Sequence, residues 1–256
     1  MKEVPLPCYA SAFCCYDGEV YVALGNSTIS KVDSNYELQE PFIQCSGVPR
    51  SIRVYKDRIY VLGDGLHFVA VYDMFGKLRS HWKFSDYGYT CGLLEVTSNH
   101  VVVPVCEKTL KEAAKSFLLL YYHNGILHRK VSCPSLSTYT CSVSLHLCSE
   151  DTVIIADYNE FCLTKVCIKT GDVLWKNTHV WKPIFVTGYA GLYALAASTG
   201  ENAIQVLDIK TGEKAGVIKN LTAGFPSYID CFNETLITGN YRTQSLFFYH
   251  INDKCT

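Results

Sequence analysis

Short apolar runs interrupted by polar turns recur along this chain with a period of about forty residues. After each turn the chain resumes with alternating β-branched and aromatic residues, which is typical of strands. A first turn in each unit precedes such a run, at 17–18, 56–57, 98–99, 150–151, 190–191 and 233–234. The pattern therefore predicts six repeats of one β-unit.

A second turn follows later in each unit, at 33–35, 73–76, 123–125, 170–171, 211–212 and 252–253. These turns are rich in Asn, Asp and Gly, which tolerate the positive φ that tight hairpins require. Two hairpin turns flanking a longer loop give four strands per unit, which is one propeller blade. We expect an all-β, six-bladed β-propeller of four-stranded antiparallel blades in a single domain, with blades near 8–45, 46–88, 89–137, 138–180, 181–224 and 225–256.

The sixth unit supplies three strands and no fourth before the sequence stops at Thr256. A segment at the other end of the chain, residues 1–7, precedes the first complete unit. Its prolines, Pro5 and Pro7, suit an outermost strand, where one row of backbone hydrogen bonds is not needed. We predict that this N-terminal segment completes the last blade.

Composition bears on the possible partners and on the cellular compartment of the protein. Lys and Arg together number 23 against 24 Asp and Glu, so the whole chain has no strong attraction for nucleic acid or anionic membranes. The thirteen cysteines are odd in number and irregularly spaced, and most sit in strand-like runs, where a thiol acts as a small hydrophobe. With no leader-like or membrane-spanning stretch, a reducing, cytoplasmic location is expected, although sequons at Asn26, Asn220 and Asn233 leave secretion open.

Residues 47–61 and 68–77 carry a family resemblance. They run Pro49, a small residue, Ile52, a turn, then Ile59-Tyr60-Val61 and Val71-Tyr72-Asp73 before Gly76, and this order resembles an NHL repeat. The resemblance implies a six-bladed propeller of the kind found in the C-terminal domains of TRIM-NHL proteins, where it serves as the substrate-recognition part of a ubiquitin ligase. No RING, B-box or zinc-spaced Cys and His pairs occur in the sequence.

Two units also look like quinoprotein-type propeller repeats. Residues 170–176 and 208–213 each contain a Thr-Gly turn, and the first ends with Trp175. In that family the tryptophan packs between blades, so the resemblance implies the same position for Trp175.

Partners of propellers usually meet the face built by the loops that enter each blade and those that join its second and third strands. On this chain these loops are rich in Tyr, which offers large and stiff contact area at little entropic cost. The candidate partner-binding residues are Tyr89, Tyr139, Tyr158, Tyr241, Arg242, Arg50 and His67. They favour a monomeric module that binds a protein or peptide without a cofactor or metal. The helix-favouring run 107–116 lengthens one of these loops.

Two other function classes remain open. Calcium-dependent lactonase propellers place Glu, Asn and Asp around the central channel, and the corresponding candidates for a metal-dependent small-molecule hydrolase are Glu3, Asp157, Asn159, Asn202 and Asp230. An RNA-binding NHL propeller is the third interpretation. The balance of 23 basic and 24 acidic residues supports only a weakly basic face for it. Because the chain shows no recognisable catalytic constellation, the sequence favours binding over catalysis.

Overall fold

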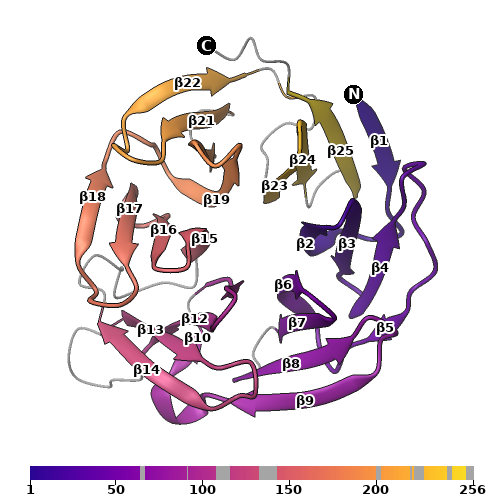
Figure 1. Cartoon of the computed structure of the whole chain (residues 1–256). Coiled ribbons are helices and arrows are strands. Elements are labelled where there is room, and N and C mark those ends of the chain that lie inside the picture. The colour runs from indigo at the N-terminus through magenta and orange to yellow at the C-terminus, as the bar shows by residue number, and fades with distance from the viewer. Residues whose placement is uncertain are drawn as a thin grey trace.

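The computed structural model describes residues 1–63, 67–90, 92–107, 116–132, 143–199, 203–219, 221, 228–240 and 244–251. Within these ranges the chain forms six antiparallel sheets arranged radially about one axis (Figure 1). The second strands of the blades are apolar along nearly their whole length, because each sheet buries both of its faces against its neighbours. The six-bladed propeller expected from the repeat is confirmed.

In the first three blades the strands follow one another in sequence order from the axis outward. Blade 1 contains β2 (Ala10–Tyr16), β3 (Glu19–Leu24), β4 (Thr28–Val32) and β5 (Ile43–Gln44). Blade 2 contains β6 (Pro49–Tyr55), β7 (Arg58–Gly63), β8 (Phe68–Asp73) and β9 (Leu78–Lys83). Blade 3 follows a short 3₁₀ helix, η1 (Ser85–Tyr87), and has a divided inner strand, with β10 (Tyr89–Thr90), β11 (Glu95–Val96), β12 (Val101–Cys106), β13 (Ser116–Tyr121) and β14 (Leu127–Ser132).

The last three blades repeat the order. Blade 4 contains β15 (Val143–Ser149), β16 (Thr152–Asp157), β17 (Cys162–Cys167) and β18 (Val173–Asn177). Blade 5 contains β19 (Pro183–Tyr189), β20 (Tyr193–Ser198), β21 (Ala203–Asp208) and β22 (Lys214–Ile218). Blade 6 contains β23 (Tyr228–Phe232), β24 (Thr235–Asn240), β25 (Ser245–His250) and, outermost, β1 (Lys2–Pro5).

Strand β1 closes the ring, as the sequence predicted. It pairs antiparallel with β25, and Lys2 lies opposite Phe248 while Pro5 lies opposite Ser245. The Ser245 hydroxyl donates a 2.8 Å hydrogen bond to the Glu3 carboxylate, which ties the two strands together by their side chains as well. Val4 is 1% exposed and anchors β1 in the apolar layer between blades 6 and 1.

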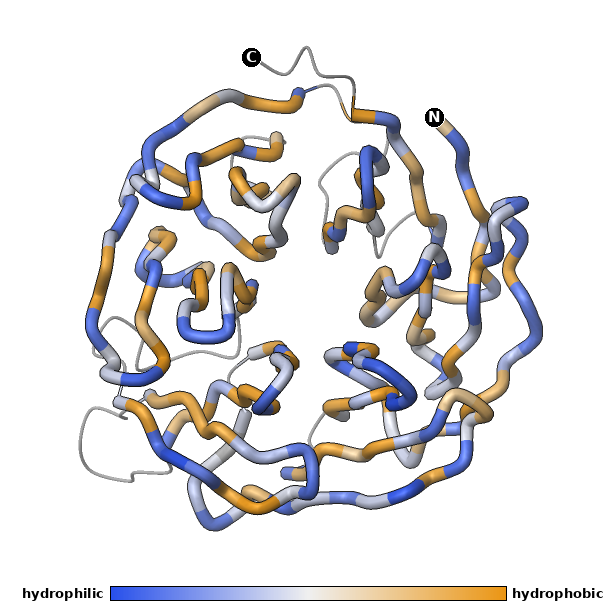
Figure 2. The backbone as a smooth tube through the Cα atoms, viewed as in Figure 1, coloured by the Kyte–Doolittle hydropathy of each residue, from blue (hydrophilic) through white to orange (hydrophobic). Residues whose placement is uncertain are grey.

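The core is divided among the blades and not concentrated at one centre. Six apolar clusters each join the facing sides of two neighbouring blades, from blades 1 and 2 around to blades 6 and 1. Hydrophobic positions follow the inner strands, while the outer strands β9, β14 and β18 are largely exposed, and β9 and β14 are also largely polar (Figure 2). Each blade is therefore stabilised by its two neighbours, as in other repeat architectures.

Trp175 shows how neighbouring blades interlock. Its indole Nε1 donates a 3.0 Å hydrogen bond to the Ile209 carbonyl of blade 5. The ring lies over Gly212, whose φ of +74° suits glycine, and a Cβ added there would approach the indole to 2.6 Å. Trp175 therefore packs between blades, as the quinoprotein-type resemblance implied.

The alternating strand directions give the propeller two different ends. The turns between first and second strands and between third and fourth strands lie at one end, which we call the turn face. The loops between second and third strands and the connections between blades lie at the other end, which we call the connection face. The candidate residues Arg50, His67 and Tyr158, which the structure describes, belong to the connection face.

Candidate functional site: the connection face and the axis

The structure describes only some of the predicted contact residues. Tyr139, Tyr241 and Arg242 lie outside the described residues. The backbone of Tyr89 begins β10, and its side chain is likewise outside the description. The side chains of the other three, Tyr158, Arg50 and His67, are described and can be placed.

Those three residues belong to two blades on different sides of the axis. Arg50 is half-buried at the start of the inner strand β6, whereas His67 is exposed just before β8 of the same blade. The His67 ring meets Phe84 edge-on, with 6.3 Å between ring centroids, so it packs on its own blade. Tyr158 follows β16 in blade 4.

Tyr158 is part of an aromatic cluster on the connection face. Phe161, in the same loop, stacks on Trp181, which enters blade 5, with ring centroids 5.3 Å apart and planes within 7°. Both rings are open to solvent, with Phe161 38% and Trp181 52% exposed. The Lys182 ammonium lies 5.8 Å from the Tyr158 ring centroid and 6.0 Å from that of Phe161. We call Tyr158, Phe161, Trp181 and Lys182 the blade-4 patch.

The loop that carries Tyr158 and Phe161 is held by Asp157. This buried side chain accepts hydrogen bonds from the backbone N–H groups of Asn159 and Glu160, at 3.0 and 3.1 Å. The turn that results leaves Phe161 with φ of +51°, a conformation that is costly for a large aromatic residue. Strained backbone of this kind tends to occur where a side chain must be presented in a fixed position.

The second half of the patch is fixed in the same manner. Lys182 also has a left-handed backbone, with φ of +47°. The Ser198 hydroxyl donates to the Trp181 carbonyl, and the Thr199 N–H donates to the Lys182 carbonyl at 3.4 Å. Two strained and hydrogen-bonded segments from adjacent blades thus bring two aromatic side chains into contact on the surface.

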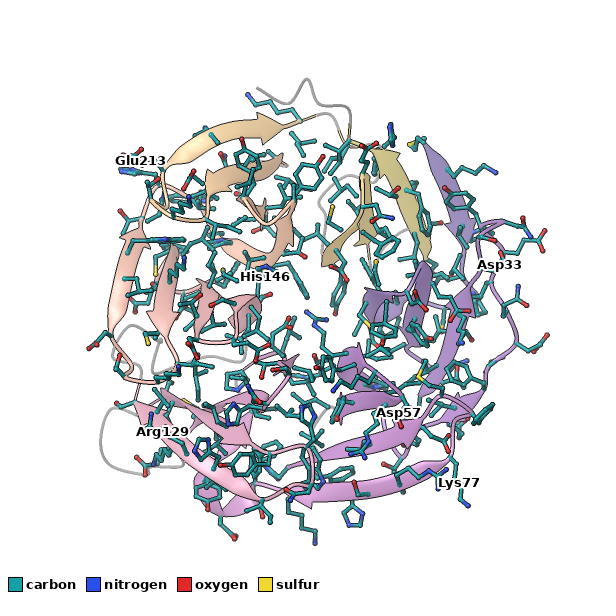
Figure 3. All side chains as sticks on the ribbon, viewed as in Figure 1. Asp33, Asp57, Lys77, Arg129, His146 and Glu213 are labelled. Carbon is teal, nitrogen blue, oxygen red and sulfur yellow. The ribbon has the colours of Figure 1, made fainter. Side chains whose placement is uncertain are left out.

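The inner strands carry a second polar arrangement around the axis. Each blade contributes one residue of its innermost strand, at an equivalent position in the register. In every blade this residue pairs with the second or third residue of the second strand. We call these six residues the axial ring. Its members are Cys14, Arg53, Glu95, His146, Thr187 and Asp230. His146 lies at the inner edge of its blade, toward the axis (Figure 3).

Hydrogen bonds link members of the axial ring across blades. Arg53 donates to Glu95 from Nε at 2.8 Å and from Nη2 at 2.5 Å. On the other side, Thr187 donates to Asp230 at 2.9 Å. The second oxygen of Asp230 accepts a 2.9 Å bond from the Cys15 backbone N–H of blade 1. These contacts satisfy the charges that the narrow centre of the propeller encloses.

Burial controls the protonation of the ring. It lowers the pKa of His146 to about 4, with Asp230 opposing and Arg53 reinforcing the shift. It raises the pKa of the Glu95 carboxyl, and the Arg53 guanidinium offsets only part of that effect. It raises the pKa of the Cys14 thiol to about 12. At neutral pH the ring therefore holds a neutral imidazole and a protonated thiol, and a protonated thiol is a poor nucleophile and a poor metal ligand.

The residues considered for a metal-dependent hydrolase do not converge on the axis. Glu3 is in the outermost strand of blade 6, and Asp157 and Asn159 form the loop of the blade-4 patch. Asp230 belongs to the axial ring, and Asn202 lies outside the described residues. Among the residues that the structure describes, no group of three or more His, Cys, Asp or Glu side chains is placed to hold a metal ion.

Two further observations concern the cysteines and the possibility of a membrane-spanning helix. Eight cysteines in the described part of the chain have free thiols, namely Cys8, Cys14, Cys15, Cys45, Cys148, Cys162, Cys167 and Cys231. The described residues contain no helix long and apolar enough to cross a lipid bilayer.

Comparison with known proteins identifies the fold. No protein-family model matches the chain, and no curated protein matches it in sequence. Among solved structures, 1108 chains match, so the fold is too widespread to indicate one function. One of them is the crystal structure of the computationally designed Ika8 protein, at 12% identity and a TM-score of 0.59, covering 97% of this chain and 99% of that one. At that identity the likeness extends to the propeller fold alone.

Proposed function

We propose that this protein is a non-catalytic binding module that recognises a protein or peptide through the connection face, with the blade-4 patch as its anchor. The observation that carries the proposal is the exposed stack of Phe161 on Trp181. Aromatic residues in fixed positions supply most of the binding energy of many protein interfaces. A surface that keeps two of them in contact with solvent is best explained by a partner.

Charge refines the description of that partner. Lys182 is the cation at the patch, and its ammonium already lies near the Tyr158 and Phe161 rings. A segment with an apolar or aromatic side chain beside an acidic one would cover the rings and pair with Lys182. The stiffness of the aromatic side chains keeps the entropic cost of such binding low.

The resemblance of residues 47–77 to an NHL repeat supports the same class of function. In the TRIM-type context that it implies, this module recognises the substrate and a separate segment carries the ligase activity. The eight free thiols support a reducing, cytoplasmic setting for this role. Both the NHL relation and the ligase context are part of the proposal.

Selection from a displayed peptide library tests the proposal without a known partner. The immobilised protein is expected to enrich peptides that combine an aromatic and an acidic residue. Trp181→Ala is expected to lower the affinity for the best synthetic peptide at least about tenfold, a typical loss for an interface anchor. Calorimetry measures this affinity. Phe75→Ala is the matched control, because Phe75 is an aromatic residue 92% exposed on the turn face.

Two results would overturn the proposal. One is the enrichment of the same peptides by wild-type protein and Trp181→Ala with equal affinity. The other is tight binding of a single-stranded RNA oligonucleotide with steep salt dependence, which would indicate that the stacked rings accept bases.

A further inference from the structure

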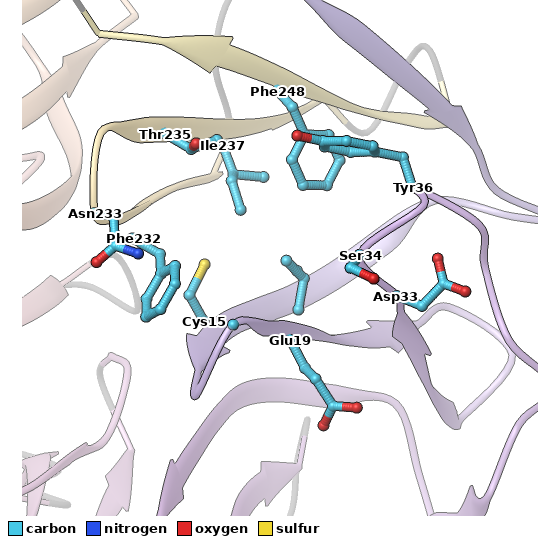
Figure 4. Close-up of a pocket in the computed structure, with 12 residues that line it drawn as sticks. Cys15, Glu19, Asp33, Ser34, Tyr36, Phe232, Asn233, Thr235, Ile237 and Phe248 are labelled. Atoms are coloured by element: carbon cyan, nitrogen blue, oxygen red, sulfur yellow. The ribbon is translucent and has the colours of Figure 1, made fainter.

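A pocket of about 250 Å³ lies at the junction of the first and last blades, on the turn face (Figure 4). Its walls come from chain segments more than two hundred residues apart in sequence. The side chains that form them are Cys15, Val20, Tyr36, Phe232, Ile237 and Phe248. The pocket exists only when the ring is closed, because blade 1 supplies one side and blade 6 supplies the other.

The aromatic wall of the pocket is held rigidly. Tyr36 meets Phe248 edge-to-face, with ring centroids 4.9 Å apart and planes at 83°. Tyr36 has φ of +65°, which is unfavourable for a residue with a large side chain. Asp33 maintains this turn by accepting backbone hydrogen bonds from Asn35 and Glu37, at 2.9 and 3.0 Å. As in the blade-4 patch, backbone strain fixes the position of an aromatic ring.

The carboxylates near the pocket already have hydrogen-bond partners. The Glu19 carboxylate accepts hydrogen bonds from the Tyr21 hydroxyl at 2.8 Å and from the Lys31 ammonium at 2.9 Å. Figure 4 shows it directed away from the rings of Tyr36 and Phe248. Asp33 uses its second oxygen to accept from the Gln39 amide at 2.9 Å. Burial raises the pKa of the Cys15 thiol, which therefore faces the pocket uncharged. A cationic ligand would find no free carboxylate here, and it would be repelled by the Lys2 ammonium, which lies 4.9 Å from the centroid of the Tyr36 ring.

Two polar side chains mark the mouth of the pocket. Ser34 and Asn233 are exposed and line it from opposite sides. A hydroxyl and an amide can each donate or accept one hydrogen bond to a ligand. Combined with apolar walls, such groups orient a molecule that has one polar end.

Size limits the ligand further. An apolar cavity of about 150 Å³ accepts benzene. The volume here, about 250 Å³, therefore suits one ring or two fused rings with a small substituent. Drug-sized ligands need more, on the order of 300 Å³ or above.

We propose that the pocket between blades 6 and 1 is a binding site for a small neutral aromatic molecule with one hydrogen-bonding group, of the size of phenol or indole. The rings of Tyr36, Phe232 and Phe248 contact its faces and edges, and Ser34 or Asn233 bonds its polar end. Because the ligand contacts both blades at once, its binding favours the closed ring. This site is on the opposite face from the blade-4 patch and does not depend on the function proposed there.

Titration of the ¹⁵N-labelled protein with indole tests the proposal. Saturable chemical-shift changes are expected at the described residues of the pocket in blades 1 and 6, together with a rise in the melting temperature. Benzylamine, an aromatic cation of similar size at neutral pH, is expected to produce neither change, because the nearby carboxylates are occupied and Lys2 repels it. Shifts spread over all six blades, or equal responses to indole and benzylamine, would overturn the proposal.

The variant Tyr36→Gly separates binding from folding. Glycine is favoured at φ of +65°, so the substitution removes the aromatic wall while relieving backbone strain. Indole affinity is expected to fall at least about tenfold. Phe161→Gly is the matched control, since it also removes an aromatic residue with a left-handed backbone but on the connection face. Phe161→Gly should leave indole binding unchanged and weaken binding of the selected peptides. Tyr36→Gly should weaken indole binding and leave peptide binding unchanged.

A second variant fills the pocket. Thr235 is half-buried and lines it from β24, and Thr235→Phe places a ring within the space where the ligand binds. It is expected to abolish the indole response in a protein whose spectrum remains that of a folded propeller. Unchanged indole affinity in both Tyr36→Gly and Thr235→Phe would contradict the proposed site.

Discussion

Gly188 of blade 5 lies so close to the His146 imidazole of blade 4 that an added Cβ would come within 2.3 Å of Nε2. Real Cβ atoms do not approach other atoms so closely, so the two residues must be considered together. Gly188 directly follows Thr187 of the axial ring, and the absence of a side chain there makes space for His146. The contact shows that neighbouring blades have matched shapes at the axis.

The substitution Gly188→Ala is therefore expected to lower the free energy of unfolding by about 1–3 kcal/mol, the usual cost of overpacking. The double substitution Gly188→Ala with His146→Ala should lose less than the sum of the two single ones, because the clash is then absent. Urea denaturation measures all three. Gly216→Ala is the control, since a Cβ there meets its nearest neighbour at an ordinary 3.9 Å. If the losses of the two single variants added up in the double variant, the predicted clash between the Cβ added by Gly188→Ala and the His146 ring would not exist.

Acidification should destabilise the protein through His146. Burial lowers the pKa of this side chain from 6.5 to about 4, so the unfolded chain binds a proton more readily than the folded one. The stabilising contribution is complete above pH 6.5 and is lost as the pH falls from there toward 4. Unfolding free energies measured across this range should decrease less steeply in His146→Gln than in the wild type.

A direct titration checks the same assignment. The imidazole proton resonances of His146 are expected to shift with a midpoint near pH 4. A midpoint close to 6.5 would show that the folded protein hydrates this imidazole as well as the unfolded chain does.

Removing only one member of the Arg53–Glu95 pair is predicted to lower the free energy of unfolding strongly. Its side chains are only 21% and 9% exposed, and Arg53→Met would leave the Glu95 carboxylate without its partner. We expect a loss of about 3–5 kcal/mol for that single substitution. Arg53→Met combined with Glu95→Leu should recover most of it, because two apolar side chains can replace a buried ion pair. Equilibrium unfolding in guanidinium chloride distinguishes these cases, and equal losses in the single and double variants would contradict the prediction.

Closure of the ring by β1 leads to a fourth prediction. Val4 is 1% exposed in the apolar layer between blades 6 and 1, and Val4→Ala should cost about 2 kcal/mol. Lys2→Ala in the same strand removes an exposed side chain and should change stability by less than about 0.5 kcal/mol. Thermal unfolding compares the two variants. Equal melting temperatures would mean that β1 adds little to the closed ring.

The fold was predictable because its rules are local. The turn at Asp17 and Gly18 requires positive φ at both residues, which are +50° and +79° in the structure, and this need is visible in the residue types themselves. Pro5 in turn suits only an outer strand, which is where β1 lies. Each of these signals involves a few neighbouring residues, and the period repeats them six times.

The candidate sites depend on contacts that a local pattern does not reveal. Tyr158 was predicted from its loop, but Phe161 resembles a core aromatic until its left-handed backbone and its stacking on Trp181 are known. Arg53 and Glu95 are 42 residues apart and pair only because inner strands of successive blades are in register. A search for polar residues at equivalent positions of each repeat could have found this ring before the structure was available.

The antiparallel pairing of β1 with β25 also determines how the protein responds to mechanical tension. Lys2 lies beside Phe248 near the two outer ends of these strands, so force applied at both ends pulls the ladder apart one residue pair at a time. Such unzipping meets far less resistance than shearing all the hydrogen bonds together. A tethered propeller under load would consequently open at the junction of blades 6 and 1 first, while the other five blades remain intact.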